Sequence, residues 1–176
     1  MALVVLLRGV NIGGHKTFRP TLIAEQLKHF DVVNIGAAGT FVVRRPVKQA
    51  RLRAEIMHRL PFESRIVICQ GKAILDLVSE NPFIGIRNRQ GTKRFVSVLT
   101  QAPRLEPSMP ILLPSTGRWL VKMQARTGRF IFGMYRPDMK VIGYLGTLDR
   151  LFGVPLTSRS WNTFIAITKV LGAEVT

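Results

Sequence analysis

The order of the short apolar segments in the first 70 residues constrains the fold more than any other feature of this sequence. Four runs rich in β-branched residues predict strands, and two amphipathic stretches between them predict helices. The strands are expected at residues 2–7, 32–35, 40–43 and 65–69, and the helices at residues 17–30, capped by Thr17, and 46–60, opened by Pro46. The order strand, helix, strand, strand, helix, strand is that of a split βαβ, or ferredoxin-like, unit.

The second half repeats this kind of pattern less regularly. After a short helix at 74–78, a strand is expected at 95–100, a hairpin from 119–124 and 130–135, and helices at 144–152 and 161–171. Four prolines between residues 101 and 116 predict an extended loop. We therefore predict an α+β protein of two ferredoxin-like halves, residues 1–83 and 94–176, with a linker at about residues 84–93.

The charge balance favours an anionic partner. The chain carries 26 Lys and Arg residues against 10 Asp and Glu residues, a formal net charge of +16. Such a field attracts polyanions, nucleic acid among them. The charge is spread evenly, since residues 1–90 hold 14 basic and 6 acidic side chains and the remainder hold 12 and 4. A dedicated nucleic-acid binder concentrates its charge in a patch, so composition alone does not identify nucleic acid as the partner.

The longest apolar run, residues 1–7, is far shorter than the roughly 20 residues of a membrane-spanning helix. A signal peptide carries its positive charge before the apolar stretch, whereas here Arg8 comes after the run and no longer apolar stretch follows. We therefore expect a cytoplasmic protein with no signal peptide and no membrane partner. The single cysteine, Cys69, lies within an apolar run and is expected to be a small buried core residue.

The first loop, RGVNIGGHKT at residues 8–17, is the strongest candidate binding segment. Its glycines permit positive φ angles and close backbone approach, and Arg8 and Lys16 supply positive charge, a combination that suits an anion. The loop differs from the nucleotide-binding signature GxxxxGK[ST], because His15 stands between Gly14 and Lys16. A nucleotide hydrolase is therefore rejected, while a softer anion site and a purely structural turn both remain open.

Chemistry of other kinds is not visible. The three histidines share no metal spacing, so neither a metal site nor a cofactor is expected, and no set of Ser, His and Asp or paired carboxylates suggests catalytic residues. Phe130 and Phe132 alternate in a manner faintly similar to an RNA-stacking motif, but the basic residue is not followed by the glycine that the motif requires. We expect both phenylalanines in the core.

Three strings carry a resemblance to a known family. LLRGVNIGG at residues 6–14, ENPF at 80–83 and GVPLTSRSWNT at 153–163 resemble a bacterial family catalogued as domain of unknown function 1697. The resemblance covers nearly the whole chain and implies two ferredoxin-like halves without an established activity. Two departures stand out, because relatives carry polar motifs where this chain has IGAAGT at 35–40 and GYLGTL at 143–148. Any chemistry of relatives that uses those groups is expected to be absent here.

Three functional hypotheses follow. The first is a basic anion-binding module that takes nucleic acid, another polyanion or a phosphorylated ligand through the glycine loop and Arg8. The alternative is an enzyme or sensor for a small anionic metabolite in a cleft between the halves. The third is a structural or interaction protein whose motifs serve folding, and the sequence predicts no oligomeric state.

The candidate ligand-binding residues are Arg8, Asn11, Gly13, Gly14, Lys16, Arg159, Trp161 and Asn162. For Trp161 and Asn162 we favour a structural role, as a core anchor and a helix cap, over contact with a ligand.

Overall fold

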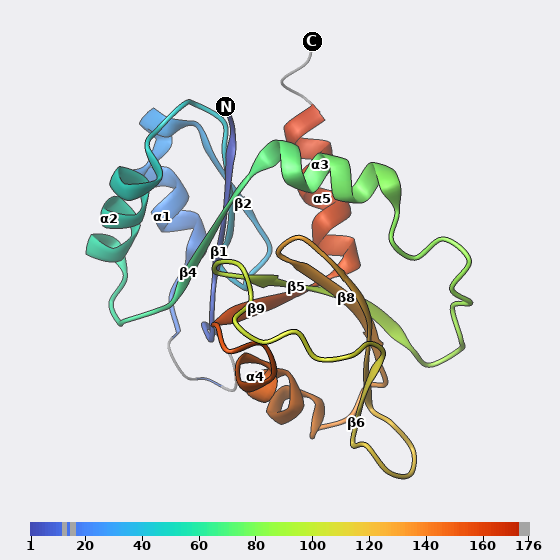
Figure 1. Cartoon of the computed structure of the whole chain (residues 1–176). Coiled ribbons are helices and arrows are strands. Elements are labelled where there is room, and N and C mark those ends of the chain that lie inside the picture. The colour runs from blue at the N-terminus through green and yellow to red at the C-terminus, as the bar shows by residue number, and fades with distance from the viewer. Residues whose placement is uncertain (12–13, 15–16, 173–176) are drawn as a thin grey trace. The chain divides into compact units, whose positions relative to one another are not determined.

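The protein is described here by a computed structural model that covers residues 1–11, 14 and 17–172. Within these residues the chain is α+β, with two antiparallel sheets and five α-helices (Figure 1). It divides into two compact units, the first made of Met1–Asn81 with Asn162–Thr176 and the second of Pro82–Trp161. None of the described helices has the length and hydropathy that a membrane span requires.

The first unit is built on a four-stranded antiparallel sheet. Its strands are β1 (Leu3–Leu7), β2 (Val32–Ile35), β3 (Thr40–Val43) and β4 (Ile66–Gln70), in the order β2-β3-β1-β4. All four strand predictions are confirmed. Every residue of β1 is buried, because the strand is central in the sheet and is covered on both faces. Cys69 on β4 is buried as predicted.

Helices cover both faces of the first sheet (Figure 1). They are α1 (Pro20–Gln26), a short 3-10 helix (Lys28–Phe30), α2 (Gln49–Arg59), α3 (Gly71–Glu80) and α5 (Trp161–Gly172). Helices α1 and α2 pack on one face, where Ile23, Leu27 and Leu52 join Val5 and Leu7 in the core. Helix α3 follows β4 directly on the opposite face, and Gly71 at its start lies against Leu171 of α5.

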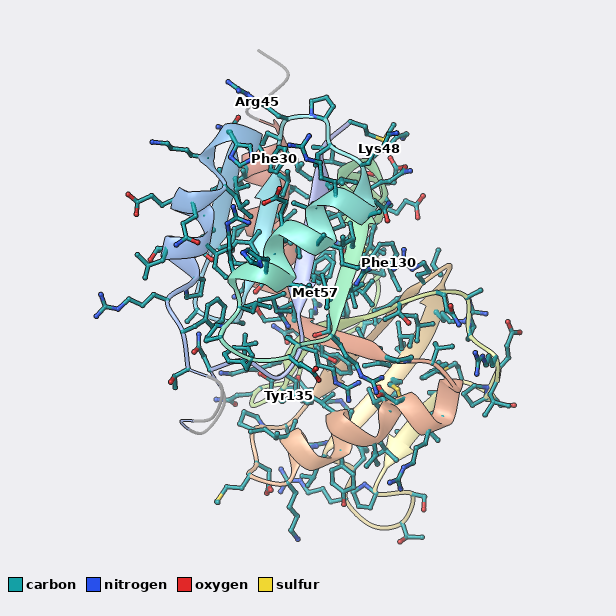
Figure 2. All side chains as sticks on the ribbon, turned by 90° about the vertical axis from the view of Figure 1, so that its left-hand side faces the viewer. Phe30, Arg45, Lys48, Met57, Phe130 and Tyr135 are labelled. Atoms are coloured by element: carbon teal, nitrogen blue, oxygen red, sulfur yellow. The ribbon has the colours of Figure 1, made fainter. Side chains whose placement is uncertain are left out.

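The predicted starts of the first two helices are wrong. The first helix begins at Pro20 and not after Thr17, because the proline ring suits the first helical position, where no intrahelical N–H bond is lost. The second begins at Gln49, three residues after Pro46. The helical pattern predicts Leu22 of α1 and Met57 of α2 on the apolar faces of these helices, but both are half exposed, at 49 % and 52 %. Figure 2 labels Met57 on α2.

The second unit is built on a five-stranded antiparallel sheet in the order β6-β7-β8-β5-β9. Its strands are β5 (Lys93–Leu99), β6 (Ile111–Leu113), β7 (Val121–Thr127), β8 (Phe130–Tyr135) and β9 (Leu156–Ser160). Helix α4 (Val141–Phe152) packs on one face, where its Leu148 and Phe152 meet Phe95, Met123 and Ile131. Gly153 ends this helix in the left-handed conformation, as its position predicts.

Two strands of the second unit differ from the sequence predictions. Residues 111–113 form β6 inside the proline-rich segment that was expected to be loop only. Residues 156–160 form β9, which pairs with β5 and had been interpreted only as part of a motif. Strand β6 has only three residues and strand β9 has one apolar residue among five, so neither gives a detectable apolar pattern. Phe130 and Phe132 are buried, which confirms that they belong to the core.

Strands β7 and β8 are joined in a register that contains a bulge. Lys122 lies opposite Met134 and Met123 opposite Gly133, whereas Ala125 lies opposite Phe132, so Gln124 is the extra residue. A Cβ atom at Gly133 would clash with the carbonyl oxygen of Lys122, and glycine is therefore required where the bulged strand comes close. Since Met123 faces α4, its neighbour Lys122 points to the opposite face of the sheet.

Candidate functional site

The first loop leaves β1 at Arg8 and contains three described residues with positive φ. The φ angles are 69° at Gly9, 53° at Asn11 and 76° at Gly14. A Cβ atom at either glycine would meet nothing within 4 Å, so the backbone conformation and not crowding calls for glycine there. Gly13 and Lys16, which were predicted as ligand contacts, lie outside the described residues.

The side-chain amide of Asn11 is engaged within the chain. Its Nδ2 donates to the carbonyl oxygens of Ala37 at 2.7 Å and Phe18 at 3.2 Å, and its Oδ1 accepts from the backbone N–H of Phe18 at 2.9 Å. These bonds join the two ends of the loop and tie it to the turn between β2 and β3. Asn11 is thus placed to hold the loop in shape, whatever the loop binds.

Arg8 is fixed through its main chain. Its N–H donates to the carbonyl oxygen of Arg65 at 3.0 Å, and its own carbonyl oxygen accepts from the Ser64 hydroxyl at 2.9 Å. Both partners lie just before β4, which pairs with β1, so the first residue of the loop is anchored to the sheet. The Arg8 side chain is partly exposed.

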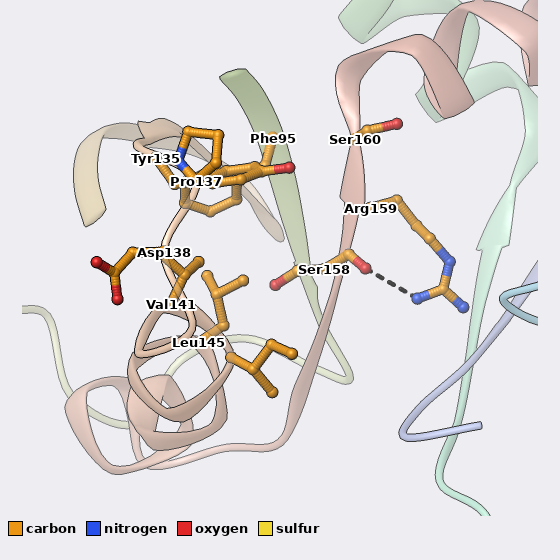
Figure 3. Close-up of a pocket in the computed structure, with 10 residues that line it drawn as sticks. Phe95, Tyr135, Pro137, Asp138, Val141, Leu145, Ser158, Arg159 and Ser160 are labelled. Carbon is orange, nitrogen blue, oxygen red and sulfur yellow. Dashed lines mark hydrogen bonds between the residues drawn. The ribbon is translucent and has the colours of Figure 1, made fainter. Parts of the chain in front are cut away.

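Arg159 lies on β9 and belongs to the second unit. Its guanidinium donates to the Ser158 carbonyl oxygen at 2.8 Å and to the Thr157 hydroxyl at 3.1 Å. Burial lowers the pKa of this guanidinium to about 10, so it remains charged at neutral pH. A pocket of about 390 Å³ lies beside β9, and Arg159 is one of its lining residues. Figure 3 shows that the Arg159 side chain points away from Tyr135 and Asp138, which also line this pocket.

The remaining predicted site residues stand at the start of α5. Trp161 packs edge-on against Phe83 with ring centroids 5.1 Å apart, and Phe83 packs in the same manner on Phe132 at 5.8 Å. Asn162 is exposed. Trp161 is grouped with the second unit and Asn162 with the first, where the Arg8 loop also lies. The pairing of that loop with Arg159 and Trp161 remains a prediction.

A second candidate site, which the sequence did not suggest, lies in the second unit. We call it the Trp119 pocket. It has a volume of about 460 Å³ and is lined by side chains from the 85–92 loop, from the segment before β7 and from β7 and β8. The lining residues are Gly85, Ile86, Arg87, Arg89, Thr92, Trp119, Lys122, Gln124 and Met134.

Trp119 is held in place by Arg136 at the end of β8. The Arg136 guanidinium carbon lies 4.2 Å from the centroid of the indole ring, a cation–π contact. The Nε of the same arginine donates to the Trp119 carbonyl oxygen at 3.0 Å, and the Arg136 backbone N–H donates to the Leu120 carbonyl oxygen at 2.8 Å. Ring and backbone of Trp119 are therefore fixed by one residue.

The basic wall of the Trp119 pocket is a loop that is tied down in two places. Arg94, beside Met134 in the sheet, donates to the Ile86 carbonyl oxygen at 3.0 Å and places its guanidinium 5.0 Å from the Phe83 ring centroid. Thr92 closes the other end, since its hydroxyl and its N–H bond to the Arg89 carbonyl oxygen at 2.7 and 3.0 Å. These anchors present Arg87 and Arg89 at the pocket.

The Trp119 pocket carries three positive charges that the described part of the chain does not neutralise. Within that part, the Arg87 and Arg89 guanidinium groups and the Lys122 ammonium make no hydrogen bond or ion pair, and no Asp or Glu lines the pocket. Ion pairs elsewhere engage other cations, such as Arg44 with Asp31 at 2.8 Å. Cations left without partners beside a concave surface suit an anionic ligand.

No group of three His, Cys, Asp or Glu side chains that could hold a metal ion occurs among the residues that the structure describes.

Two basic residues of the Trp119 pocket, Arg87 and Arg89, were visible in the sequence within the charged segment IGIRNRQGTK, which was interpreted as a linker. Only the sheet register brings this segment next to Trp119 and Lys122, which are about 30 residues away in the chain.

These features define an α+β protein with two antiparallel sheets and a basic pocket. The chain belongs to the family described as protein of unknown function (DUF1697), whose model matches residues 1–118. The family inferred from the sequence strings is thus confirmed. No curated protein matches the chain in sequence.

One solved structure shares the fold over nearly the full length of both chains. It is the conserved bacterial protein SP0830 from Streptococcus pneumoniae, with a TM-score of 0.61 and 15 % sequence identity. The similarity covers 97 % of this chain and 98 % of that one. At this level of identity the similarity concerns the fold alone.

Proposed function

We propose that the protein is a basic anion-binding module that takes phosphorylated ligands at the Trp119 pocket. The observation that carries the proposal is the set of three cationic side chains, Arg87, Arg89 and Lys122, at one concave surface without a carboxylate among its lining residues. Phosphate oxygens accept charge-assisted hydrogen bonds from Arg and Lys, and Arg can offer two at once.

The charge of the whole chain supports the same proposal. With 26 basic and 10 acidic side chains, one-to-one pairing would leave at least 16 cations without a carboxylate partner. The resulting field raises the local concentration of anions and speeds their association. The pocket adds what a diffuse field lacks, which is a fixed geometry for the ligand.

The glycine loop remains a second proposed contact for the same class of ligand. In this proposal Arg8, Gly13, Gly14 and Lys16 contact the anion, and Asn11 acts as a positioning residue because its amide is engaged within the chain. Arg159, Trp161 and Asn162 are proposed to complete that contact. Each of these proposed contacts can be tested by mutating the residue, independently of the Trp119 pocket.

The alternative, an enzyme or sensor for a small anionic metabolite, is supported by the size of the Trp119 pocket. Its volume of about 460 Å³ is within the range of small-molecule sites, which is roughly 300 to 1,000 Å³. A metabolite sensor predicts binding that survives moderate salt, whereas a polyanion-binding module predicts binding that weakens steeply with salt.

We also propose that the first unit is a ferredoxin-like half. Its antiparallel strand order β2-β3-β1-β4, with α1 after β1 and α2 after β3, supports this assignment. The second unit, with five strands and one helix between β8 and β9, is proposed as a less regular relative of the same plan.

The test is calorimetric titration with short inorganic polyphosphate. The Arg87→Ala/Arg89→Ala double variant is expected to bind at least about tenfold more weakly than wild type, because hydrogen bonds to charged groups contribute about 1.5 to 3 kcal/mol each. The matched control is Lys140→Ala/Arg150→Ala, which removes the same charge at exposed residues at either end of α4. If both double variants lost the same affinity for polyphosphate, the loss would reflect net charge alone, and the proposed site would be wrong.

A further inference from the structure

We propose that the Trp119 pocket accepts one nucleotide of a single-stranded nucleic acid. The base lies against the Trp119 indole, and the flanking phosphates lie on Arg87, Arg89 and Lys122. This inference rests on the proposed anion binding and adds the class of ligand. It concerns the second unit only and does not involve the first loop.

The aromatic residue is the first argument. Trp119 is only partly buried and borders the pocket, although an indole is among the most costly side chains to leave next to water. Arg136 fixes it by the cation–π contact at 4.2 Å and by the bond to its carbonyl oxygen. A ring held in this manner loses little conformational entropy when a base stacks on it, which makes it an effective stacking platform.

The position of the cations relative to the ring is the second argument. Lys122 lies three residues after Trp119 on β7, and Arg87 and Arg89 come from the loop that forms another wall of the same pocket. A nucleotide has this composition, a flat apolar base joined to an anionic phosphate. Inorganic phosphate or an acidic peptide would satisfy the cations but would leave the indole without a partner.

The floor of the pocket supplies the third argument. Met134 is buried at 6 % exposure and offers a polarizable apolar surface, while Gln124, the extra residue of the bulge, carries an amide that can both donate and accept. An amide of this kind can bond to the edge of any base. Together the lining residues offer an aromatic ring, an apolar surface, an amide and three cations, which are the groups needed to bind a base and its phosphates.

The concave shape of the pocket favours a single strand over a duplex. In a duplex the base faces are stacked on one another and cannot reach an indole inside a pocket of about 460 Å³. An unstacked base of a single strand can enter it. The backbone then continues on both sides over a surface whose charge is strongly positive overall.

The experiment compares three fluorescent ligands with the same number of phosphates: oligothymidylate, an abasic phosphodiester strand and a duplex. We expect wild-type protein to bind oligothymidylate about 5- to 150-fold more tightly than the abasic strand, which is the measured range for stacking one base on an aromatic side chain. Oligouridylate is included as a fourth ligand, so that the RNA and DNA forms of the single strand are distinguished.

Variants at Trp119 locate the effect. Trp119→Ala and Trp119→Leu are each expected to remove the preference for oligothymidylate over the abasic strand, whereas Trp119→Phe retains part of it. The Arg87→Ala/Arg89→Ala double variant is expected to lower the affinity for oligothymidylate and for the abasic strand by the same factor, because it removes phosphate contacts only. Melting temperatures are recorded for every variant, and the wild-type comparison of ligands decides the question even if Trp119→Ala fails to fold.

A spectroscopic measurement gives an independent signal. The chain has two tryptophans, so in the Trp161→Phe variant the fluorescence reports Trp119 alone. Stacking of a base is expected to quench this emission on addition of oligothymidylate, while the abasic strand leaves it unchanged.

The outcomes separate the inference from the proposed function. Equal affinity of wild type for oligothymidylate and the abasic strand overturns base stacking, while binding of polyphosphate still supports anion binding. Equal affinity for the duplex overturns the choice of a single strand. Failure of every ligand, polyphosphate included, overturns both proposals.

Discussion

The first loop and the Trp119 pocket both combine backbone turns with positive charge, but they use their polar side chains in opposite ways. In the loop, the Asn11 amide makes three hydrogen bonds to the chain itself. In the pocket, the side-chain cations of Arg87, Arg89 and Lys122 make none within the described residues. The loop that carries the two arginines is held instead by Arg94 and Thr92. Under the proposed function, anchoring and binding would thus fall to different residues of the pocket.

The difference shows how a polar motif should be evaluated. A string such as LLRGVNIGG attracts attention because its composition is unusual, yet Asn11 within it has a folding task that explains its presence. The segment IGIRNRQGTK has an ordinary linker composition, yet it delivers two arginines to a pocket. A candidate ligand contact is therefore strengthened when its hydrogen-bonding groups are left unused by the fold.

The largest expected effect is on the stability of the second unit, and it tests the bulge between β7 and β8, the two strands that line the pocket. Gly133→Ala is expected to destabilise the second unit by about 3 kcal/mol or more, because the added methyl group would clash with the Lys122 carbonyl oxygen in the bulge. Urea denaturation measures the loss. Gly143→Ala is the control, since a Cβ there meets nothing within 4 Å and alanine in helix α4 is expected to add up to about 1 kcal/mol. A neutral Gly133→Ala would mean that the bulge does not exist in solution.

The next effect tests whether the loop polar group serves folding. Asn11→Ala is expected to cost about 2 to 4 kcal/mol of unfolding free energy, from three hydrogen bonds and a φ of 53° that alanine tolerates poorly. Asn34→Ala is the matched control, with one bond from its Nδ2 to the Gly36 carbonyl oxygen and an expected cost of about 0.5 to 1.5 kcal/mol.

Polyphosphate titration of the folded Asn11→Ala variant completes this prediction. Binding at the Trp119 pocket is expected to match that of wild type, because Asn11 is not among its lining residues. If the variant kept full stability and lost polyphosphate binding, Asn11 would be a ligand contact, and the contrast between loop and pocket would be wrong.

A smaller effect tests the anchor of the basic wall. Arg94→Met is expected to cost about 1 to 2 kcal/mol, because it removes the bond to the Ile86 carbonyl oxygen and the cation–π contact with Phe83. Amide hydrogen exchange in residues 84–92 should become faster, and polyphosphate binding weaker. Arg94→Lys keeps the charge but not the planar guanidinium, so full affinity in that variant would show that charge alone matters.

The smallest effect concerns one phosphate contact. Lys122→Gln is expected to change the unfolding free energy by less than about 0.5 kcal/mol, since the ammonium group has no partner in the described chain. For oligothymidylate, the slope of log K against log salt concentration should fall in magnitude by about 0.7. Lys169→Gln on α5 removes an exposed lysine that does not line the pocket, and an equal change in slope there would argue for diffuse attraction.

The sequence was most informative where the apolar pattern was strong. Strands β1 to β4 follow from short apolar runs rich in β-branched residues, and strand β8 follows from an apolar run rich in aromatic residues. Gly153 marks the end of α4. The helix starts at Pro20 and Gln49 were missed, because two prolines and a threonine offered competing signals. Edge strand β6 was missed because it has only three residues, and edge strand β9 was missed because four of its five residues are polar.

The site was harder to predict than the fold. Arg87 and Trp119 are far apart in the chain, and no local pattern shows that a sheet register places them at one pocket. The role of Asn11 was equally hidden, since its partner Ala37 lies 26 residues away. Tertiary contacts of this kind leave no periodic trace in a single sequence.

The bulge at Gln124 also divides the β7–β8 hairpin into two sections with separate registers. Lys122 and Met134 pair on one side of it, and the turn at residues 127–130 lies on the other. Because the extra residue absorbs a change in alignment, insertions or deletions near the turn can be accommodated without moving Lys122 relative to Trp119. A change in the length of the hairpin tip is therefore expected to leave the pairing of Lys122 with Met134 in place.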